Sequence, residues 1–190
     1  MKLVFATHNP NKFREIKSML PSHIELLSLS DIDCHEDIEE TGDTIDENAI
    51  IKAEFIRNHY GYDCFADDTG LEVDSLAGAP GVFSARYAGE EKNDEANIEK
   101  LLSQLKERDD RTARFKTVIA LNLKGNQNLF TGICKGRILD KKRGDKGFGY
   151  DPIFLPDGYN NSFAEMELEE KSKISHRGIA FKELIEYLSK

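Results

Sequence analysis

The chain has 190 residues, enough for one domain with a sizeable core, and carries 26 Lys and Arg against 35 Asp and Glu, a net charge of -9. Proteins that coat nucleic-acid duplexes are usually basic, so this charge disfavours a nucleic-acid polymer as partner. No apolar stretch is long enough to span a membrane, and the three distant cysteines, Cys34, Cys64 and Cys134, argue against a disulfide framework or a zinc knuckle. We therefore expect a cytoplasmic protein with no membrane partner and a single domain over residues 1–190.

The first predicted strand, residues 2–6, runs into a polar loop and then a helix. The loop consists of Thr7, His8, Asn9, Pro10, Asn11 and Lys12, and the apolar stripe of the helix consists of Phe13, Ile16, Met19 and Leu20. The N–H groups at a helix start lack partners and attract anions, and Lys12 adds a positive charge there. The loop matches no general phosphate-binding motif, so an ordinary connection capped by Asn11 is favoured on these residues alone.

A second strand is predicted over residues 24–29, and an acidic segment, residues 31–42, follows it. Thr44 and Glu47 then form a capping box at the head of a helix that Gly61 ends. The buried stripe of this helix is predicted to be Ile45, Ala49, Ala53 and Ile56. Asn48 and Lys52 lie one turn apart on a different face, so they either decorate the surface or line a cleft.

The most informative stretch is residues 64–71, where an apolar run ends in Asp67 and Asp68, followed by Thr69 and Gly70. Successive side chains of a strand point to opposite faces, so one acid can enter a cleft while the other braces the structure. A carboxylate at the carboxyl end of a strand is typical of ligand sites in α/β proteins. Asp and Gly also favour plain turns, and on these residues alone a turn and a site are equally favoured.

The second half of the chain alternates strand and helix patterns. Strands are predicted over residues 71–74, 113–123, 129–135 and 137–139. A turn at 124–128 makes a β-hairpin of the second and third, and a helix is predicted over 93–106. A loop rich in small residues, 78–87, suits close approach of a ligand or a partner subunit, and a plain linker is an equal alternative.

The loop at residues 144–152 contains three glycines and two aromatic residues, which suits a flat ligand, although its aromatics alternatively plug the edge of the core. Ser162 and Glu165 form another capping-box pattern ahead of a polar helix. A link at 171–177 precedes the last helix, whose core stripe is Phe181, Leu184, Ile185 and Leu188. The alternation of strands and helices with one hairpin predicts an α/β protein with a mixed sheet.

Five short motifs occur in order along the chain: T-x-N-x-x-K, E-E-T-G, A-D-D-T-G-L, F-G-Y-D-P and S-H-R. Their order and spacing resemble the inosine triphosphate pyrophosphatase family, which removes deaminated purine nucleotides with the help of Mg²⁺. The resemblance extends from residue 2 to the final helix. It implies an elongated, curved mixed β-sheet flanked by helices, two lobes that enclose a cleft, and a homodimer.

The resemblance also implies roles for individual residues. Asp68 and Lys52 would be catalytic, and Glu40 and Asp68 would bind Mg²⁺, although Glu39 competes with Glu40 for the second metal position. The loop from Thr7 through His8, Asn9, Pro10 and Asn11 to Lys12 would hold the triphosphate. The remaining substrate contacts would come from Thr69, Phe148, Gly149, Tyr150, Asp151, Lys171, His176 and Arg177.

The implied reaction is hydrolysis of the α–β phosphoanhydride of ITP, dITP or XTP, giving the monophosphate and pyrophosphate. Donors near Arg177 would favour the purine C6 carbonyl over the amino group of adenine. One rival class is an aspartic protease, because Asp68-Thr69-Gly70 spells its D-T-G signature, but that chemistry needs two such aspartates. A second rival is a sensor that binds the nucleotide without cleaving it.

Overall fold

The computed structural model describes residues 1–189, and the chain divides into two compact units. Unit 1 contains Met1–Asp68, Thr117–Thr131 and Ala180–Lys190, and unit 2 contains Thr69–Lys116 and Gly132–Ile179. Three strands contribute residues to both units: β3 (Cys64–Val73), β5 (Thr112–Leu123) and β6 (Asn126–Ile138). The assignment of residues 1–190 to a single domain therefore stays a prediction.

The strands form one mixed sheet in the order β2-β1-β3-β5-β6-β7, and β4 pairs with β3 outside this order. The remaining strands are β1 (Lys2–Phe5), β2 (Glu25–Leu27), β4 (Pro80–Gly81) and β7 (Phe154–Pro156). β1 pairs in parallel with β2 and β3, whereas β4 is antiparallel to β3 and β7 is antiparallel to β6. The predicted mixed α/β sheet is confirmed.

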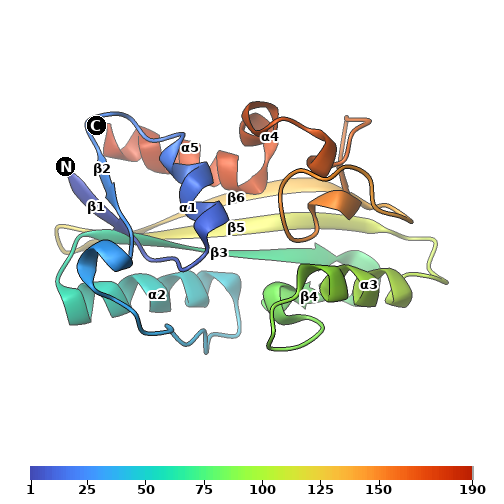
Figure 1. The fold of residues 1–190 in the computed structure, drawn as a ribbon, viewed down its shortest axis with the longest axis horizontal. Coiled ribbons are helices and arrows are strands. Elements are labelled where there is room, and N and C mark those ends of the chain that lie inside the picture. The colour runs from blue at the N-terminus through green and yellow to red at the C-terminus, as the bar shows by residue number, and fades with distance from the viewer. Residues whose placement is uncertain (190) are drawn as a thin grey trace. The chain divides into compact units, whose positions relative to one another are not determined.

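The helices of unit 1 cover both faces of its strands. Figure 1 shows α2 (Ile45–Tyr60) on one face, with α1 (Pro10–Lys17) and the later part of α5 (His176–Leu188) on the other. The α1 and α5 side packs on strand residues of a hydrophobic core cluster of this unit: Leu3, Phe5, Phe65, Ile119 and Leu121. The rings of Phe5 and Phe65 stack at 4.6 Å, which ties the parallel pair β1 and β3 together.

The start and end of α1 differ from the sequence prediction. Asn9, rather than Asn11, caps the helix, because its side chain accepts hydrogen bonds from the N–H groups of Asn11 and Lys12 and Pro10 occupies the first turn. The helix ends at Lys17, so the predicted stripe residues Met19 and Leu20 lie beyond it. Both still pack against the core, which explains why they are apolar.

The prediction for α2 is confirmed at both ends. Thr44 and Glu47 make the reciprocal capping box, and Gly61 ends the helix with a left-handed φ of 73°. The predicted stripe is buried: Ile45, Ala49, Ala53 and Ile56. The polar pair on the neighbouring face is buried as well, with Asn48 1% and Lys52 7% exposed, so it does not decorate the surface.

The prediction that a strand ends at Asp67 and Asp68 is wrong. β3 continues through both acids to Val73, where the short antiparallel strand β4 supports it through the pair Leu71 and Gly81. The separately predicted strand over 71–74 is the end of β3. Because both acids lie inside a strand, their side chains must point to opposite faces of the sheet.

β5 and β6 are neighbours joined at Lys124 and Gly125, which have φ values of 48° and 89°. Two consecutive positive φ values suit a two-residue hairpin turn, so the turn is shorter than the predicted 124–128. Because of this shorter turn, β6 begins earlier than predicted. It continues through Ile138, so the strands predicted over 129–135 and 137–139 are one strand.

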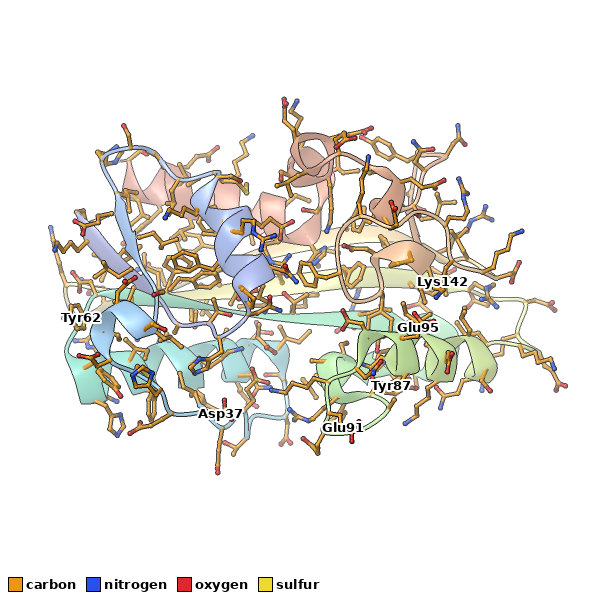
Figure 2. The ribbon with its side chains drawn as sticks, viewed as in Figure 1. Asp37, Tyr62, Tyr87, Glu91, Glu95 and Lys142 are labelled. Atoms are coloured by element: carbon orange, nitrogen blue, oxygen red, sulfur yellow. The ribbon has the colours of Figure 1, made fainter. Side chains whose placement is uncertain are left out.

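Unit 2 contains α3 (Asp94–Gln104) and α4 (Leu168–Ile174), and the start of α5. Its core includes Leu71 of β3, Leu101 of α3, Phe154 of β7 and Phe163, which follows β7 in the chain. At the surface, the side chains of Lys142 and Glu95, labelled in Figure 2, form an ion pair of 2.5 Å. Such an exposed pair contributes little to stability, so the apolar core holds this unit together.

Five short 3₁₀ helices complete the described structure: η1 (Ser30–Ile32), η2 (Asp74–Leu76), η3 (Ser84–Arg86), η4 (Asp151–Ile153) and η5 (Phe163–Glu165). The predicted capping box of Ser162 and Glu165 is present, but it begins η5 rather than an α-helix. The predicted link at 171–177 is wrong, because Lys171 belongs to α4 and α5 begins at His176. None of the helices among residues 1–189 combines the length and apolar character needed to cross a lipid bilayer.

Candidate active site

The two acids of β3 face different helices. On one side of the strand, the Cys64 thiol donates to the carbonyl of Ala53 on α2 at 3.1 Å. On the other side, Phe65 packs in the core shared with α1. Strand alternation therefore directs Asp68 toward α2 and Asp67 toward α1, as the sequence predicted for two adjacent acids.

Asp68 lies in a buried charge cluster with a lysine and a second acid. Lys52 Nζ donates to Asp68 Oδ1 at 2.9 Å and to Glu40 Oε1 at 2.7 Å, so one ammonium group bridges two carboxylates. The side chains of Lys52 and Asp68 are about one-tenth exposed, whereas that of Glu40 is 28% exposed. Glu39 is exposed, and Asp37 in the same acidic segment points to solvent (Figure 2). Glu40 is thus the acid of this segment that joins the cluster.

Burial and charge act on this cluster in opposite directions. Burial alone lowers the pKa of Lys52, but the attraction of Asp68, Glu40 and Asp67 outweighs it, so this pKa is raised and the amine stays protonated. Burial raises the pKa of Asp68, and Glu40 adds to that effect, while Lys52 and Lys12 oppose it. Asp68 is therefore a carboxylate that takes up a proton more readily than an exposed aspartate does.

Asp67 holds the lysine of the first loop. Its Oδ2 lies 2.9 Å from Lys12 Nζ, and the two side chains are 2% and 15% exposed. The loop itself is ordered by local hydrogen bonds between residues close in sequence. Thr7 Oγ1 accepts from the Asn9 N–H at 3.2 Å, and Asn9 caps α1. The ammonium group of Lys12 is thus fixed beside the start of a helix, where an anion is favoured.

The helix-start amides of this loop differ from the expectation. The N–H groups of Asn11 and Lys12 are bound by the Asn9 side chain at 2.9 and 3.2 Å, so they are not open to a phosphate as the sequence suggested. His8 Nε2 lies 2.9 Å from the Glu36 carbonyl, and a carbonyl only accepts, so this nitrogen carries the proton. His8, Pro10 and Asn11 are exposed.

In unit 2, a buried ion pair holds the aromatic loop at residues 144–152. Asp151 Oδ2 accepts from Lys171 Nζ at 2.7 Å and from the Phe148 N–H at 2.9 Å, and both charged side chains are 5% exposed. Gly147 has a φ of 75°, and a Cβ there would lie 2.0 Å from the same oxygen. Only glycine allows the backbone to approach Asp151 this closely.

Two further hydrogen bonds hold this loop at Gly149 and Tyr150. The Tyr150 hydroxyl donates to the carbonyl of Ser84 at 2.8 Å, and the Gly149 N–H donates to Asp94 Oδ2 at 2.8 Å. Burial raises the pKa of Tyr150, so the phenol stays protonated and keeps its hydrogen bond. Asp94 was not predicted as a site residue, because an acid in the first turn of a helix is equally well explained by the helix dipole.

Phe148 and the S-H-R motif lie together. Lys171 Nζ and Arg177 Cζ are each 5.3 Å from the centroid of the Phe148 ring, within the range of cation–π attraction. The His176 ring stacks on Phe115 at 4.5 Å. Lys171, His176 and Arg177 are at most 4% exposed, so all three side chains belong to the buried interior of unit 2.

Thr69 follows Asp68 in β3 and is half-buried. The structure thus groups the predicted site residues into two sets, one in each unit. Unit 1 brings together Glu40, Lys52, Asp67, Asp68 and Lys12, and unit 2 brings together Phe148, Asp151, Lys171, His176 and Arg177. All of these except Asp67 were predicted site residues, and Asp67 was expected only as the acid on the other face of the strand. The contacts between them were not predicted.

The unit 1 cluster is the candidate for a divalent metal. No group of three or more His, Cys, Asp or Glu side chains within residues 1–189 is arranged to hold a metal ion. Mg²⁺ is commonly bound by only one or two protein carboxylates, with water and substrate phosphates completing its shell. Glu40 and Asp68, whose oxygens share the Lys52 ammonium group, form such a donor pair, so the residues present fit Mg²⁺.

Comparison with known proteins places the sequence beside curated relatives along its whole length. A model of the Ham1 family matches residues 3–187. A protein of Christiangramia forsetii named dITP/XTP pyrophosphatase is 86% identical over 190 residues and is covered completely, as is this chain. A protein of the same name from Flavobacterium psychrophilum is 61% identical over 187 residues, or 98% of each chain.

Two solved structures have the same fold as this chain. The Staphylococcus aureus Ham1 protein superposes with a TM-score of 0.91 at 42% identity, over 100% of this chain and 98% of the other. A HAM1 protein from Coxiella burnetii superposes with a TM-score of 0.92 at 39% identity, with the same coverage. The predicted fold class, a mixed sheet with flanking helices, is confirmed.

Proposed function

The chain belongs to the Ham1 family, and we propose that it is a nucleoside-triphosphate pyrophosphatase that hydrolyses dITP, ITP and XTP to the monophosphate and pyrophosphate. The observation that carries this proposal is the buried lysine that bridges Glu40 and Asp68. Two acids and a lysine in one buried cluster provide a proton acceptor, a cation for phosphate oxygens and ligands for a metal. Asp68 has a lysine as its partner, whereas an aspartic protease needs a second aspartate there.

We propose that the residues of the first loop bind the phosphate chain. Lys12 carries its charge at the start of α1, where the helix dipole also favours an anion. Asp67 keeps this charge in place before the substrate arrives, and triphosphate oxygens would replace or share that partner. Thr7 and Asn9 contribute by ordering the loop, and His8, Pro10 and Asn11 complete its exposed surface.

In the chemical step, we propose that the Asp68 carboxylate accepts the proton of the attacking water. Its raised pKa makes it a better proton acceptor than an exposed aspartate. Lys52 remains charged beside it, orients the carboxylate and attracts phosphate oxygens. Glu40 and Asp68 would hold Mg²⁺, which when bound supplies neutralisation of the phosphate charge and polarisation of the phosphoryl group.

We propose that the second set of residues recognises the base. Phe148 provides an aromatic face, and the cations of Lys171 and Arg177 stabilise its position. A hypoxanthine or xanthine C6 carbonyl accepts hydrogen bonds that His176 and Arg177 can donate, whereas the adenine amino group leaves such donors unpaired. Gly149, Tyr150 and Asp151 would shape the loop, and Thr69 would add a further substrate contact.

The proposed function is tested by measuring pyrophosphate release from ITP, dITP, XTP, ATP and GTP with and without Mg²⁺. We expect release from the first three, loss of activity with EDTA, and no effect of pepstatin. If the protein binds ITP but releases no pyrophosphate, it is instead a nucleotide sensor. Release of inorganic phosphate in place of pyrophosphate would contradict the proposed bond cleavage.

We expect Lys12→Ala to weaken triphosphate binding far more than nucleoside binding, because only the phosphate chain loses its charged partner. The measurement is the dissociation constant of ITP and of inosine for wild type and variant, obtained without Mg²⁺ to prevent turnover. Lys17→Ala, at the far end of the same helix, is the matched control. An equal loss for both ligands would place Lys12 away from the phosphates.

We expect Arg177→Ala to reduce the preference for ITP over ATP at least several-fold, since the variant loses a donor to the C6 carbonyl and the cation beside Phe148. The measurement is the ratio of the two kcat/KM values. Because Arg177 is buried, the Tm of the variant is measured in parallel. An unchanged ratio with a general loss of activity would assign Arg177 to phosphate binding or to structure.

We also propose that the protein works as a homodimer in the cytoplasm. Cys34, Cys64 and Cys134 are all buried free thiols, which suits a reducing compartment. Burial raises the pKa of the Cys134 thiol to about 11, which keeps it protonated and unreactive. Sedimentation of the purified protein at several concentrations tests the dimer, and a monomer throughout would contradict it.

A further inference from the structure

Asn48 makes a buried contact with the acidic segment that carries Glu40. It lies on α2 one turn before Lys52 and is 1% exposed. Its Oδ1 accepts the Gly42 N–H at 2.8 Å, two residues after Glu40. The side chain therefore fastens the backbone of this segment to the same helix that carries the lysine of the cluster.

Gly42 fits against α2 with no space for a side chain. A Cβ at this position would lie 2.6 Å from the Glu47 Cβ and 2.8 Å from Asn48 Oδ1. At distances below about 3.0 Å one of the two groups must shift, so the close approach depends on glycine as well as on Asn48. The hydrogen bond accepted by Asn48 Oδ1 and the absence of a side chain at Gly42 are thus both needed for the same contact between this segment and α2.

We propose that Asn48 is a positioning residue for the Mg²⁺ site: by holding Gly42 against α2, it sets the place of the Glu40 carboxylate relative to Lys52 and Asp68. This inference rests on the proposed function. Glu40 is partly exposed and belongs to a segment without regular secondary structure, so its own surroundings fix it less than β3 fixes Asp68. Groups that orient a metal ligand typically change metal affinity or activity by about 10- to 100-fold when they are removed.

A neighbouring set of hydrogen bonds provides a control. The Glu47 carboxylate accepts from the N–H groups of Asp43 and Thr44 at 2.8 and 3.2 Å, and Thr44 Oγ1 accepts from the Glu47 N–H at 3.1 Å. This capping box lies on the other side of Gly42 from Glu40 in the chain. Its loss weakens the start of α2 without releasing the contact of Asn48.

The experiment uses three test variants: Asn48→Ala, Gly42→Ala and the double variant that combines these two changes. Thr44→Ala is the control with which they are compared. For each protein we would measure the Mg²⁺ concentration that gives half-maximal pyrophosphate release from dITP, and the rise in Tm that MgCl₂ causes without nucleotide. We expect Asn48→Ala and Gly42→Ala each to raise the half-maximal concentration by about 10-fold and to reduce the rise in Tm. The double variant should be no worse than the stronger single variant, because both changes remove one contact.

Thr44→Ala should lower the Tm and leave the Mg²⁺ dependence unchanged. An equal shift of the Mg²⁺ dependence in Thr44→Ala, or none in the Asn48 and Gly42 variants, would overturn the inference while the wild type still releases pyrophosphate. If the wild type releases none, the proposed function itself fails. Gly42→Ala keeps the test decisive if Asn48→Ala does not fold.

Discussion

Asp68→Asn is expected to lower the kcat of pyrophosphate release by about 10²- to 10⁴-fold, the usual cost of losing a general base. The amide has nearly the shape of the carboxylate, but it does not accept the proton of the attacking water and lacks the negative charge that strengthens the binding of a divalent cation. KM should change less than kcat, because Lys12 and the residues around Phe148 are untouched. The measurement is kcat for dITP at saturating Mg²⁺.

The folded state should tolerate this substitution. Lys52 keeps its bond of 2.7 Å to Glu40, and the amide oxygen of the variant still accepts from the same ammonium group. The carboxylate of Asp68 is costly to bury, as its raised pKa indicates, so a neutral amide also removes an unfavourable contribution. We therefore expect thermal unfolding close to that of the wild type.

Asp67→Asn is the matched control, since it makes the same chemical change one residue earlier on the opposite face of β3. Its carboxylate holds Lys12 at 2.9 Å, so this variant should bind the triphosphate differently and lose more in KM than in kcat. A near-normal kcat for Asp68→Asn, together with a folded but inactive Asp67→Asn, would show that Asp67, not Asp68, is the proton acceptor.

The separation of these two acids was predictable from sequence because it follows from the period of a strand. Adjacent residues of β3 face opposite sides wherever the strand ends, so the error in its length did not affect the result. The length itself was mispredicted because Asp, Thr and Gly favour turns locally. Tertiary pairing in the sheet overrides that preference, since β3 lies next to β5 and pairs with β4 at Leu71 and Glu72. Nothing in the local pattern reveals a partner as short as Pro80–Gly81.

The ion pairs of the site could not be predicted from spacing. Lys12 and Asp67 come from different elements and are far apart in sequence, as are Lys171 and Asp151, and only the tertiary fold brings each pair together. The ordered motifs identified most of these residues but not their contacts. Asn48 shows the same limit, because its position one turn before Lys52 was visible while its bond to Gly42 was not.

Lys52→Met is expected to destabilise the protein by about 3–5 kcal/mol, since breaking a buried pair leaves uncompensated charge behind. Glu40 and Asp68 would then face each other with no cation between them, while methionine keeps most of the volume of the lysine stem. The measurement is the free energy of unfolding in urea at pH 8. Lys173→Met is the control, because its pair with Glu169 is largely exposed and should contribute little to stability.

The pH dependence of this variant tests the cause of its instability. Burial and Glu40 raise the pKa of Asp68, whereas Lys52 and, to a smaller extent, Lys12 lower it, so the loss of Lys52 raises this pKa further. A folded-state pKa above the unfolded value means that the folded protein binds the proton more tightly, so its stability falls as the pH rises through the raised pKa. The deficit of Lys52→Met relative to wild type should therefore be smaller at pH 5 than at pH 8. A deficit that is equal at both values would show that lost packing, rather than the two unpaired carboxylates, destabilises the variant.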